Sequence, residues 1–316
     1  MNIVNNSNLI LMSEKGFVMS LEMYRIICTA GFVLVLLGIV LTAAGMLSRF
    51  RPVTSEPSSR SAKGSKVNIY SSSSIGGRQT QQDYCLSSNS IPAQLTRAAG
   101  MFGVVCDGMG GMEGGETASR MCSELMLSGY YQNGGSEDIC QKLKELILAA
   151  DRQVSKLTTA DGRLLNCGTT VVAAAIRDRL IHWASAGDSR IYHVRGGTIQ
   201  QITRDHNFRL TLTERYHAGY ISLEEIERNP QKNALISFVG KGRNLLVDTG
   251  TLELDPTAGD LVIMCSDGLY KALRADEILA VTMQVANKSQ LPDALISAAL
   301  SNVQIKHDNI TVMVIA

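Results

Sequence analysis

The sequence predicts an α+β fold in which helices cover antiparallel sheets. Apolar, strand-like runs dominate residues 67–316, and several follow one another through short turns such as 177–179 and 195–197. Short turns between such runs are typical of hairpins, which are antiparallel. The helical patterns are grouped instead of alternating with the strands, and this grouping favours helices that cover sheets from outside.

Each element is expected from its own hydrophobic pattern. Apolar runs bounded by turn residues predict strands, over residues 67–75, 101–106, 169–177, 180–187, 190–195, 197–203, 250–255, 260–266 and 309–316. Apolar residues at helical spacing predict helices over about 116–130, from a Ser136 N-cap to 157, and over about 275–285 and 292–302. Residues 203–242 are polar and helix-leaning, so we expect a flap-like insertion there.

The N-terminal region predicts a membrane anchor. Residues 26–47 form 22 consecutive residues without a charge, which as a helix would be roughly 33 Å long, matching a hydrocarbon core of about 30 Å. Basic residues dominate the downstream flank, so the positive-inside rule places residues 1–25 outside and the C-terminal side in the cytoplasm. A cleaved secretory signal is the rival interpretation, and a buried core helix is a third.

Three features of the composition limit the organisation, partners and location expected for the rest of the chain. Residues 48–66 are rich in Ser, Pro and basic residues and are expected to be a flexible linker before one domain at 67–316. The formal net charge is +1 with 19% charged residues, so no nucleic-acid partner is expected. Seven cysteines without a CxxC motif, with Cys106 and Cys265 inside apolar runs, indicate reduced buried thiols and a cytoplasmic domain.

Four aspartates stand at the ends of apolar runs: Asp107 within "GVVCDGMGG" (103–111), Asp188, Asp267 and Asp308. Singly, each is explained by ordinary turn chemistry. Gathered at one sheet edge they would repel, since two like charges at 4 Å cost on the order of 4 kcal/mol at an effective dielectric of 20. They must then be protonated or held by cations, and hard oxygen ligands favour Mg²⁺ or Mn²⁺. The glycines beside Asp107 leave room for a backbone carbonyl ligand and for water.

Seven motifs carry a family resemblance. They are "GGRQTQQD" (76–83), "CDGMGG" (106–111), "GTT" (168–170), "GDSR" (187–190), "TRDH" (203–206), "CSDGL" (265–269) and "HDNIT" (307–311). In this order and spacing the chain resembles the metal-dependent protein phosphatases of type 2C, or PPM, and its Asp-Gly-Met-Gly-Gly stretch resembles the bacterial branch. The resemblance implies an αββα four-layer sandwich and phosphoserine/phosphothreonine phosphatase activity.

The resemblance also implies roles for residues. Asp107 would bridge two Mn²⁺ or Mg²⁺ ions, Asp267 and Asp308 would complete the first site, and the Gly108 carbonyl would serve the second. Asp188 with Asp267 matches a third, weaker metal site. Arg78 matches the arginine that grips the substrate phosphate, for which a planar guanidinium is suited. A metal-activated water would then attack phosphorus without a phosphoenzyme.

The chain departs from the family pattern at several places. Gln81-Gln82 precede Asp83 where the family has Asn followed by Glu or Gln, so neutral Gln82 adds no charge to the second metal's water shell. Met109 replaces the histidine of many eukaryotic members, which leaves the general acid unassigned. A metal-bound water could serve, and His206 is another candidate, although it is expected to pack locally instead. Ile236-Ser237 stand where bacterial relatives carry Thr-Arg, so the flap is expected to behave differently.

Other functions were weighed against this one. The Gly-rich stretch after Asp107 lacks GK[ST], and Glu113 breaks GxGxxG, so nucleotide-binding loops are rejected. Another metal-dependent phosphoester hydrolase, or an inert membrane-tethered module of the same fold, remain as alternatives. The expected partners are phosphorylated proteins, those of a cognate Ser/Thr kinase, and the expected location is the bacterial cell membrane, single-pass, with a cytoplasmic catalytic domain.

Overall fold

The chain divides into two units, residues 1–63 and 64–316. The structure, a computed structural model, describes residues 11–12, 18–19, 67–110, 114–132, 138–302 and 306–316. In the first unit, β1 (Leu11–Met12) pairs antiparallel with β2 (Val18–Met19). The expected membrane helix at 26–47 and linker at 48–66 lie outside the described residues. Across the part of the chain that is described, no helix has both the length and the apolar character needed to cross a bilayer.

The second unit contains two sheets in which every strand pairing is antiparallel. The β12 sheet has the order β10 (Thr198–Gln201), β9 (Arg190–Arg195), β12 (Leu261–Cys265), β13 (Ile310–Ile315) and β3 (Ile69–Ser74). The β5 sheet has the order β11 (Asp248–Glu253), β8 (Leu180–Ala186), β7 (Val171–Arg177), β5 (Met101–Met109) and β4 (Asp83–Ser87), and β6 (Gly168–Thr169) pairs with β5.

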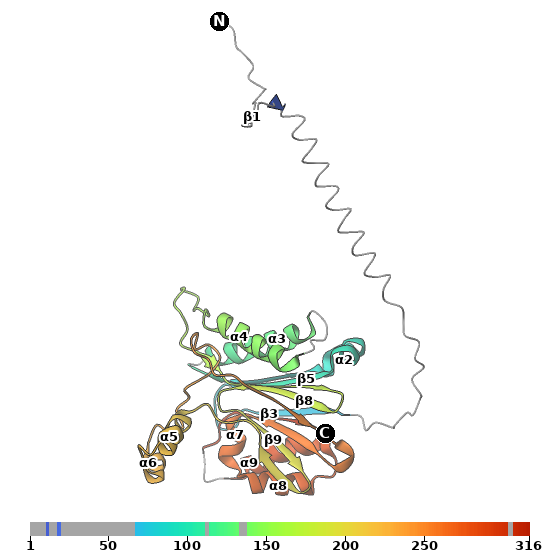
Figure 1. Ribbon diagram of the computed structural model, residues 1–316. Coiled ribbons are helices and arrows are strands. Elements are labelled where there is room, and N and C mark those ends of the chain that lie inside the picture. Colours follow the sequence, from blue (N-terminus) through green and yellow to red (C-terminus); the bar gives the residue numbers. More distant parts are fainter. Residues whose placement is uncertain (1–10, 13–17, 20–66, 111–113, 133–137, 303–305) are drawn as a thin grey trace, which may run out of the picture. The chain divides into compact units, whose positions relative to one another are not determined.

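Helices cover the outer face of each sheet, so four layers stack as helix, sheet, sheet and helix (Figure 1). The helices on the β5 sheet are α3 (Gly114–Tyr131) and α4 (Ile139–Val154), and those on the β12 sheet are α7 (Asp267–Ala272), α8 (Ala275–Gln284) and α9 (Leu291–Leu300). The short α2 (Ala93–Ala99) precedes β5. The predicted α+β class, with helices over antiparallel sheets, is confirmed.

Three apolar clusters hold the layers together. Leu143 and Met126 lie in the cluster between α3, α4 and the β5 sheet, and Leu295 lies in the cluster between the β12 sheet and its helices. Val105 and Met264 belong to the third cluster, which fills the space between the sheets. Since burial of a large apolar side chain contributes about 1.5–3 kcal/mol, these clusters are the main source of stability.

The turns and caps follow local chemistry. The β7–β8 hairpin turns through Asp178 (φ 53°) and Arg179 (φ 67°), and the β9–β10 hairpin through Gly196 (φ 57°) and Gly197 (φ 74°). Positive φ at both turn positions matches the twist of the strands. The N-cap of α4 is Asp138, whose carboxylate accepts from Gln141 N at 2.9 Å. The expected cap at Ser136 was therefore wrong by two residues.

A two-helix hairpin occupies the predicted insertion. It consists of α5 (Phe208–His217) and α6 (Leu223–Arg228), and it stands to one side of the sandwich in Figure 1. The chain returns along the base of the hairpin, where Phe208 N donates to Ala234 O at 2.8 Å and Val239 pairs with Thr169. The returning segment therefore connects the insertion to β6 of the β5 sheet.

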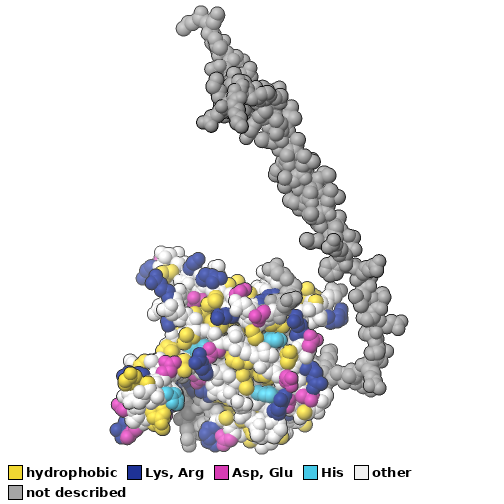
Figure 2. Space-filling view, in the orientation of Figure 1, with side chains coloured by type: hydrophobic (Ala, Val, Ile, Leu, Met, Phe, Trp, Pro, Cys, Tyr) yellow, Lys and Arg dark blue, Asp and Glu magenta, His cyan; other side chains and the backbone are white. Residues whose placement is uncertain are grey.

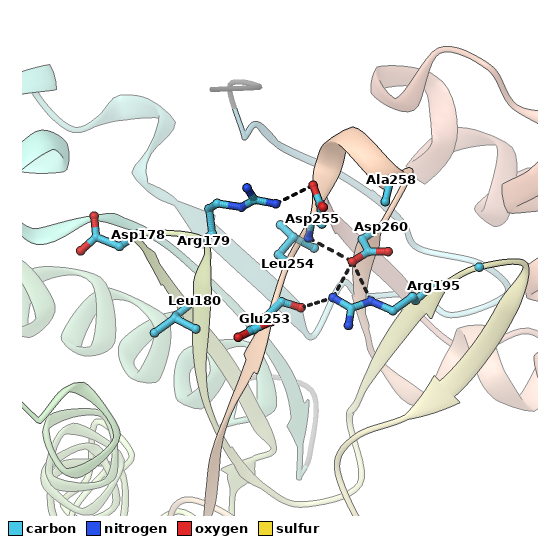
Figure 3. Close-up of a pocket in the computed structure, with 10 residues that line it drawn as sticks. Asp178, Arg179, Leu180, Arg195, Glu253, Leu254, Asp255, Ala258 and Asp260 are labelled. Carbon is cyan, nitrogen blue, oxygen red and sulfur yellow. Dashed lines mark hydrogen bonds and ion pairs between the residues drawn. The ribbon is translucent and has the colours of Figure 1, made fainter. Parts of the chain in front are cut away.

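Arg195 links the two sheets at the end where β8 and β12 begin, because it contacts both Asp260 and the Glu253 carbonyl (Figure 3). Arg195 donates to Asp260 Oδ2 at 2.8 Å and to the Glu253 carbonyl at 2.8 Å, and Arg179 pairs with Asp255 at 2.6 Å. These residues line a pocket of about 580 Å³. Because β8 and β12 run away from this pocket, Asp188 and Asp267 come at the opposite end of the sandwich.

The face of the second unit seen in Figure 2 carries Lys and Arg side chains interspersed with Asp and Glu. Paired examples on the surface are Arg209–Glu227 and Arg204–Asp248, each with a shortest contact of 2.7 Å. Exposed pairs of this kind typically contribute 0–1 kcal/mol, so the apolar layers rather than surface charges hold the fold.

Candidate active site

Strand ends from both sheets bring the predicted aspartates to one pocket of about 310 Å³. Asp107 lies near the end of β5, Asp188 follows β8, Asp267 follows β12, and Asp308 precedes β13. The pocket is lined by Arg78, Gln82, Asp107, Gly108, Met109, Gly110, Thr170, Asp188, Leu235, Asp267, Lys271, Asp308 and Asn309. Every predicted site residue except Asp83 is in this lining.

The backbone around Asp107 is fixed by Thr169 of β6 and by Thr170, which follows it. Thr170 N and the Thr169 hydroxyl both donate to the Asp107 carbonyl at 2.9 Å, and Asp107 N donates to the Thr170 hydroxyl at 3.2 Å. With both backbone groups engaged, only the carboxylate of Asp107 is left to face the pocket. The "GTT" motif therefore orients Asp107.

Gly108 stands where the chain has no room for a side chain. A Cβ there would lie 2.1 Å from Gly115 O and 2.6 Å from Gln82 O, both backbone atoms. Gly108 N donates to Gln82 O at 3.0 Å, and the Ser119 hydroxyl donates to the same carbonyl at 2.6 Å. The glycine thus lets β5, the start of α3 and residue 82 approach one another beside Asp107.

Arg78 lies at the mouth of the pocket and is paired with Asp308. Its Nη2 is 2.5 Å from Asp308 Oδ2, and the Arg78 side chain is 51% exposed. The neighbouring Asn309 fixes the loop that carries Arg78: its Nδ2 donates to the carbonyls of Ile75 and Thr80, at 2.9 and 3.1 Å, and its Oδ1 accepts from Gln82 N at 2.8 Å. One amide side chain therefore holds both the arginine loop and Gln82.

Asp83 lies behind the pocket lining, between the sheets. It is opposite Asp107 in the β4–β5 register and only 4% exposed. The Ser266 hydroxyl donates to its Oδ2 at 2.7 Å, whereas its Oδ1 has no hydrogen-bond partner. A buried carboxylate with one unpartnered oxygen is costly unless it is protonated or near a cation.

Asp188 is placed by a glycine turn and a buried histidine. Gly187 has φ 111°, and its N–H donates to His206 Nδ1 at 3.2 Å. His206 is fully buried, and its Nε2 lies 3.1 Å from Asp248 Oδ2. The His206 carbonyl accepts from Ile236 N at 3.0 Å, so this residue joins the Asp188 turn to the flap. His206 does not line the pocket, in agreement with its expected local packing role.

The carboxylates interact strongly with one another. Burial is the largest effect and raises the pKa of Asp107 well above its usual value, and four neighbouring carboxylates raise it further: Asp83, Asp267, Asp188 and Asp308. Burial likewise raises the pKa of Asp188 to about 6, with added repulsion from Asp267. Each of these carboxylates is therefore harder to ionise than a free aspartate, and a bound cation would offset that cost.

Two positive side chains partly balance this charge. Burial raises the pKa of Asp267, while its ion pair with Lys271 and the charge of Arg78 act to lower it. For Lys271, partial burial acts to lower the pKa, but the charge of Asp267 and its hydrogen bond outweigh that effect and raise it. The protein thus places an ammonium group and a guanidinium group among its acidic residues.

These residues fit a site for hard divalent cations. The donors are carboxylate and carbonyl oxygens, the carboxylates repel one another, and the buried Oδ1 of Asp83 lacks a partner. Within the described ranges, no three Asp, Glu, His or Cys side chains converge closely enough to hold one ion by themselves. Water and backbone carbonyls would therefore have to complete the coordination, as Mg²⁺ and Mn²⁺ commonly allow.

Four pocket residues were not anticipated from the sequence: Thr170, Leu235, Lys271 and Asn309. Thr170 and Asn309 lie inside motifs already recognised, next to the expected residues. Lys271 follows Asp267 by four residues, the spacing of neighbours on a helix, but no helix was predicted where α7 lies. Leu235 belongs to the flap, whose contact with the pocket depends on tertiary structure.

The fold is thus a four-layer sandwich whose candidate site is a cluster of carboxylates from both sheets, and this cluster fits divalent cations. The pattern of the protein phosphatase 2C family matches residues 72–301, so the chain belongs to that family. The predicted membership is confirmed.

Individual relatives agree with the family assignment. The serine/threonine phosphatase stp of Listeria welshimeri is 30% identical over 215 residues, which span 67% of this chain and 82% of that protein. The serine/threonine phosphatase of S. agalactiae superposes with a TM-score of 0.66 at 27% identity, covering 79% of this chain and 99% of the other. The catalytic domain of the phosphatase PstP, solved with 2 manganese ions, superposes with a TM-score of 0.62 at 26% identity, covering 79% and 97%.

Proposed function

We propose that this chain is a metal-dependent protein phosphatase that hydrolyses phosphoserine and phosphothreonine. The observation that carries the proposal is the gathering of Asp107, Asp188, Asp267 and Asp308 in one pocket with Arg78 at its mouth. Family membership and the names of the relatives support the same activity.

In this proposal Asp107, Asp267, Asp308 and the Gly108 carbonyl would hold two Mn²⁺ or Mg²⁺ ions, with water completing the coordination. Bound divalent ions would supply Lewis acidity, which lowers the pKa of water and offsets phosphoryl charge. Thr169 and Thr170 hold Asp107 in place, and Asn309 holds Gln82 and the Arg78 loop.

Arg78 binds the substrate phosphate. Its side chain is half exposed and its guanidinium can present two parallel N–H donors to phosphate oxygens. The ion pair with Asp308 aims the guanidinium at the pocket while leaving donors on its outer side. Asp308 therefore orients Arg78 as well as contributing a ligand.

A protein nucleophile is not required. Burial raises the pKa of Cys265 to about 12 and that of Cys106 well above its usual value, so both thiols stay protonated and unreactive. Both are buried within strands and do not line the pocket. Hydrolysis by water is thus the route that the chain's own groups support.

The test uses the full chain and a matched pair of aspartate variants. We expect Mn²⁺-dependent hydrolysis of para-nitrophenyl phosphate and of phosphothreonine peptides, lost in Asp107→Asn. Asp178→Asn, an exposed hairpin aspartate whose side chain is 91% exposed, should keep the activity. Equal, metal-independent rates in the Asp107→Asn variant and the parent would overturn the proposal. A preference for nucleotides would favour the other phosphoester hydrolases, and no turnover in any form would favour an inert module.

We further propose that residues 26–47 anchor the chain in the bacterial cell membrane, with the phosphatase domain in the cytoplasm. The uncharged segment and the basic flank that follows it support this placement. The natural substrates would then be phosphoproteins made by a Ser/Thr kinase of the same cell. Fractionation with protease accessibility tests the topology: a soluble chain, or a protease-sensitive domain in intact cells, would reject it.

A further inference from the structure

Lys271 brings a positive charge into the aspartate pocket from the same helix that carries Asp267. It lies four residues after Asp267 on α7, its Nζ forms an ion pair with Asp267 Oδ2, and it lines the pocket. The Asp267 side chain is only 15% exposed, whereas that of Lys271 is 54% exposed. The ammonium group therefore caps a mostly buried carboxylate from the solvent side.

Ordinary helix ion pairs in this protein look different. Glu116–Arg120 on α3 and Glu224–Arg228 on α6 have the same four-residue spacing, but their side chains are all at least 44% exposed. Neither pair lines the aspartate pocket. Lys271 differs because its partner, Asp267, is largely buried and lies in a pocket with other carboxylates.

Asp188 also lines the aspartate pocket, and two side chains of α7 act on it. The hydroxyl of Tyr270 and the positive charge of Lys271 both act to lower the pKa of Asp188, so both groups lie near its carboxylate. Tyr270 is held in place because the Arg190 guanidinium stacks 3.5 Å from its ring centroid. Arg190 is in turn fixed by two hydrogen bonds to Asp205, of 3.0 and 2.7 Å. The partners of Asp188 are therefore rigid parts of the protein.

We propose that the Lys271 ammonium occupies the cation position between Asp267 and Asp188, so that this phosphatase binds two divalent ions and excludes a third. The inference rests on the proposed metal-dependent function. It assigns Lys271 as a positioning residue, which holds Asp267 and balances Asp188 without touching the reacting atoms.

The charges account for the exclusion. Two carboxylates attract one ammonium, which already lies on Asp267, and a further divalent ion would meet that like charge at contact distance. Removing the ammonium should therefore open a third site.

The experiment counts bound ions on the full chain. Metal-free protein is titrated with Mn²⁺ by isothermal titration calorimetry, and bound Mn²⁺ is counted after equilibrium dialysis. We expect two ions per chain for the parent protein and for Lys271→Arg, which keeps the charge. Lys271→Asp, which adds a ligand, should bind three, and Lys271→Gln should gain the third with weaker affinity.

Two controls separate a metal site from a general change in charge. Lys144→Asp makes the same charge change on an exposed position of α4 and should stay at two ions. Adding Asp188→Asn to Lys271→Asp should return the count from three to two. Circular dichroism establishes that each variant is folded before ions are counted.

The outcomes distinguish this inference from the function on which it rests. A parent protein that binds three ions, or a folded Lys271→Asp that still binds two, overturns the role of Lys271 and leaves the phosphatase proposal intact. A parent protein that binds no Mn²⁺ overturns both. A helix-stabilising role alone would change the melting temperature of the Lys271 variants without changing the ion count.

Discussion

The Ser266 hydroxyl donates a hydrogen bond to the buried Asp83 carboxylate, with 2.7 Å between Oγ and Oδ2. Asp83 begins β4 of the β5 sheet, whereas Ser266 follows β12 of the other sheet. Ser266 Oγ also accepts from Thr311 N at 2.9 Å. One hydroxyl thus joins the two sheets directly behind the aspartate pocket.

Removing that hydroxyl should weaken the contact between the sheets. We expect Ser266→Ala to lower the free energy of unfolding by about 1–3 kcal/mol, because it leaves the buried Asp83 carboxyl and Thr311 N without this hydrogen-bond partner. Denaturant unfolding of the metal-free protein measures the change. Ser301→Ala, whose hydroxyl bonds only to a helix carbonyl on the surface, is the control and should change stability by no more than about 0.5 kcal/mol. Equal stabilities of the two variants would contradict the proposed role of Ser266.

The buried Asp83 should make the metal-free protein less stable as the pH rises from about 4 to about 7. Burial, opposed by the Ser266 hydrogen bond, raises the pKa of Asp83 from 3.8 to about 7. Between those values the folded state binds more protons than the unfolded state, so stability decreases with increasing pH. A shift of this size corresponds to an upper bound of about 4 kcal/mol.

The control for this pH effect is the Asp83→Asn variant. Its free energy of unfolding is measured in the presence of a chelator over the same pH range. The free energy of unfolding of the variant should fall less steeply with pH than that of the parent. The fall that remains comes from Asp107 and Asp188, whose pKa values are also raised. Identical slopes for the variant and the parent would show that Asp83 ionises as readily when folded as when unfolded.

Divalent ions should reverse this instability. A ligand that binds only the folded state at 100 times its dissociation constant stabilises it by about 2.7 kcal/mol. We expect Mn²⁺ to raise the melting temperature of the parent protein at pH 7.5 by several degrees, about 2–4 °C per kcal/mol for a domain of this size. Asp107→Asn should lose most of that rise, and Asp178→Asn should retain it. A rise of the same size in Asp107→Asn would mean that the ions bind elsewhere.

Arg78→Ala should impair phosphate binding without impairing metal binding. Loss of hydrogen bonds to a charged phosphate is expected to cost about 1.5–3 kcal/mol, or roughly 10- to 150-fold in kcat/KM for a phosphopeptide. Because the variant also frees Asp308 from its ion pair, its affinity for Mn²⁺ should be unchanged or higher. Steady-state kinetics with parallel Mn²⁺ titration separates these effects. Weaker Mn²⁺ binding in the variant would show that Arg78 acts through the metal site.

Much of the fold could be predicted because its signals are local. Apolar runs joined by turn residues mark most of the strands, and the same runs place the four aspartates at their ends. The strand β4 escaped prediction because it is a short segment between polar neighbours, and its pairing with β5 defines it. The helix α7 escaped because its first residues, Asp267 and Gly268, also suit a turn.

The candidate metal ligands could be predicted from the sequence. The groups that offset the negative charge of these ligands were harder to predict. Lys271 contacts Asp267 within one helix, but its effect on Asp188, like that of Tyr270, depends on two strand ends that meet only in the fold. Asn309 had no separate signal, since its three hydrogen bonds join it to a loop more than 200 residues earlier. Such tertiary relationships are not encoded in a local pattern.

Gly108→Ala tests whether the close approach of backbone segments beside Asp107 is essential. The added Cβ would lie 2.1 Å from Gly115 O and 2.6 Å from Gln82 O, so α3 or residue 82 would have to move. We expect a loss of about 1–3 kcal/mol in the free energy of unfolding, typical of overpacking, together with weaker Mn²⁺ binding. Gly129→Ala is the matched control, because its Cβ would meet only the movable Leu146 side chain. If Gly108→Ala binds Mn²⁺ as tightly as Gly129→Ala does, the close approach of the backbone segments at residue 108 is not required for holding the ion.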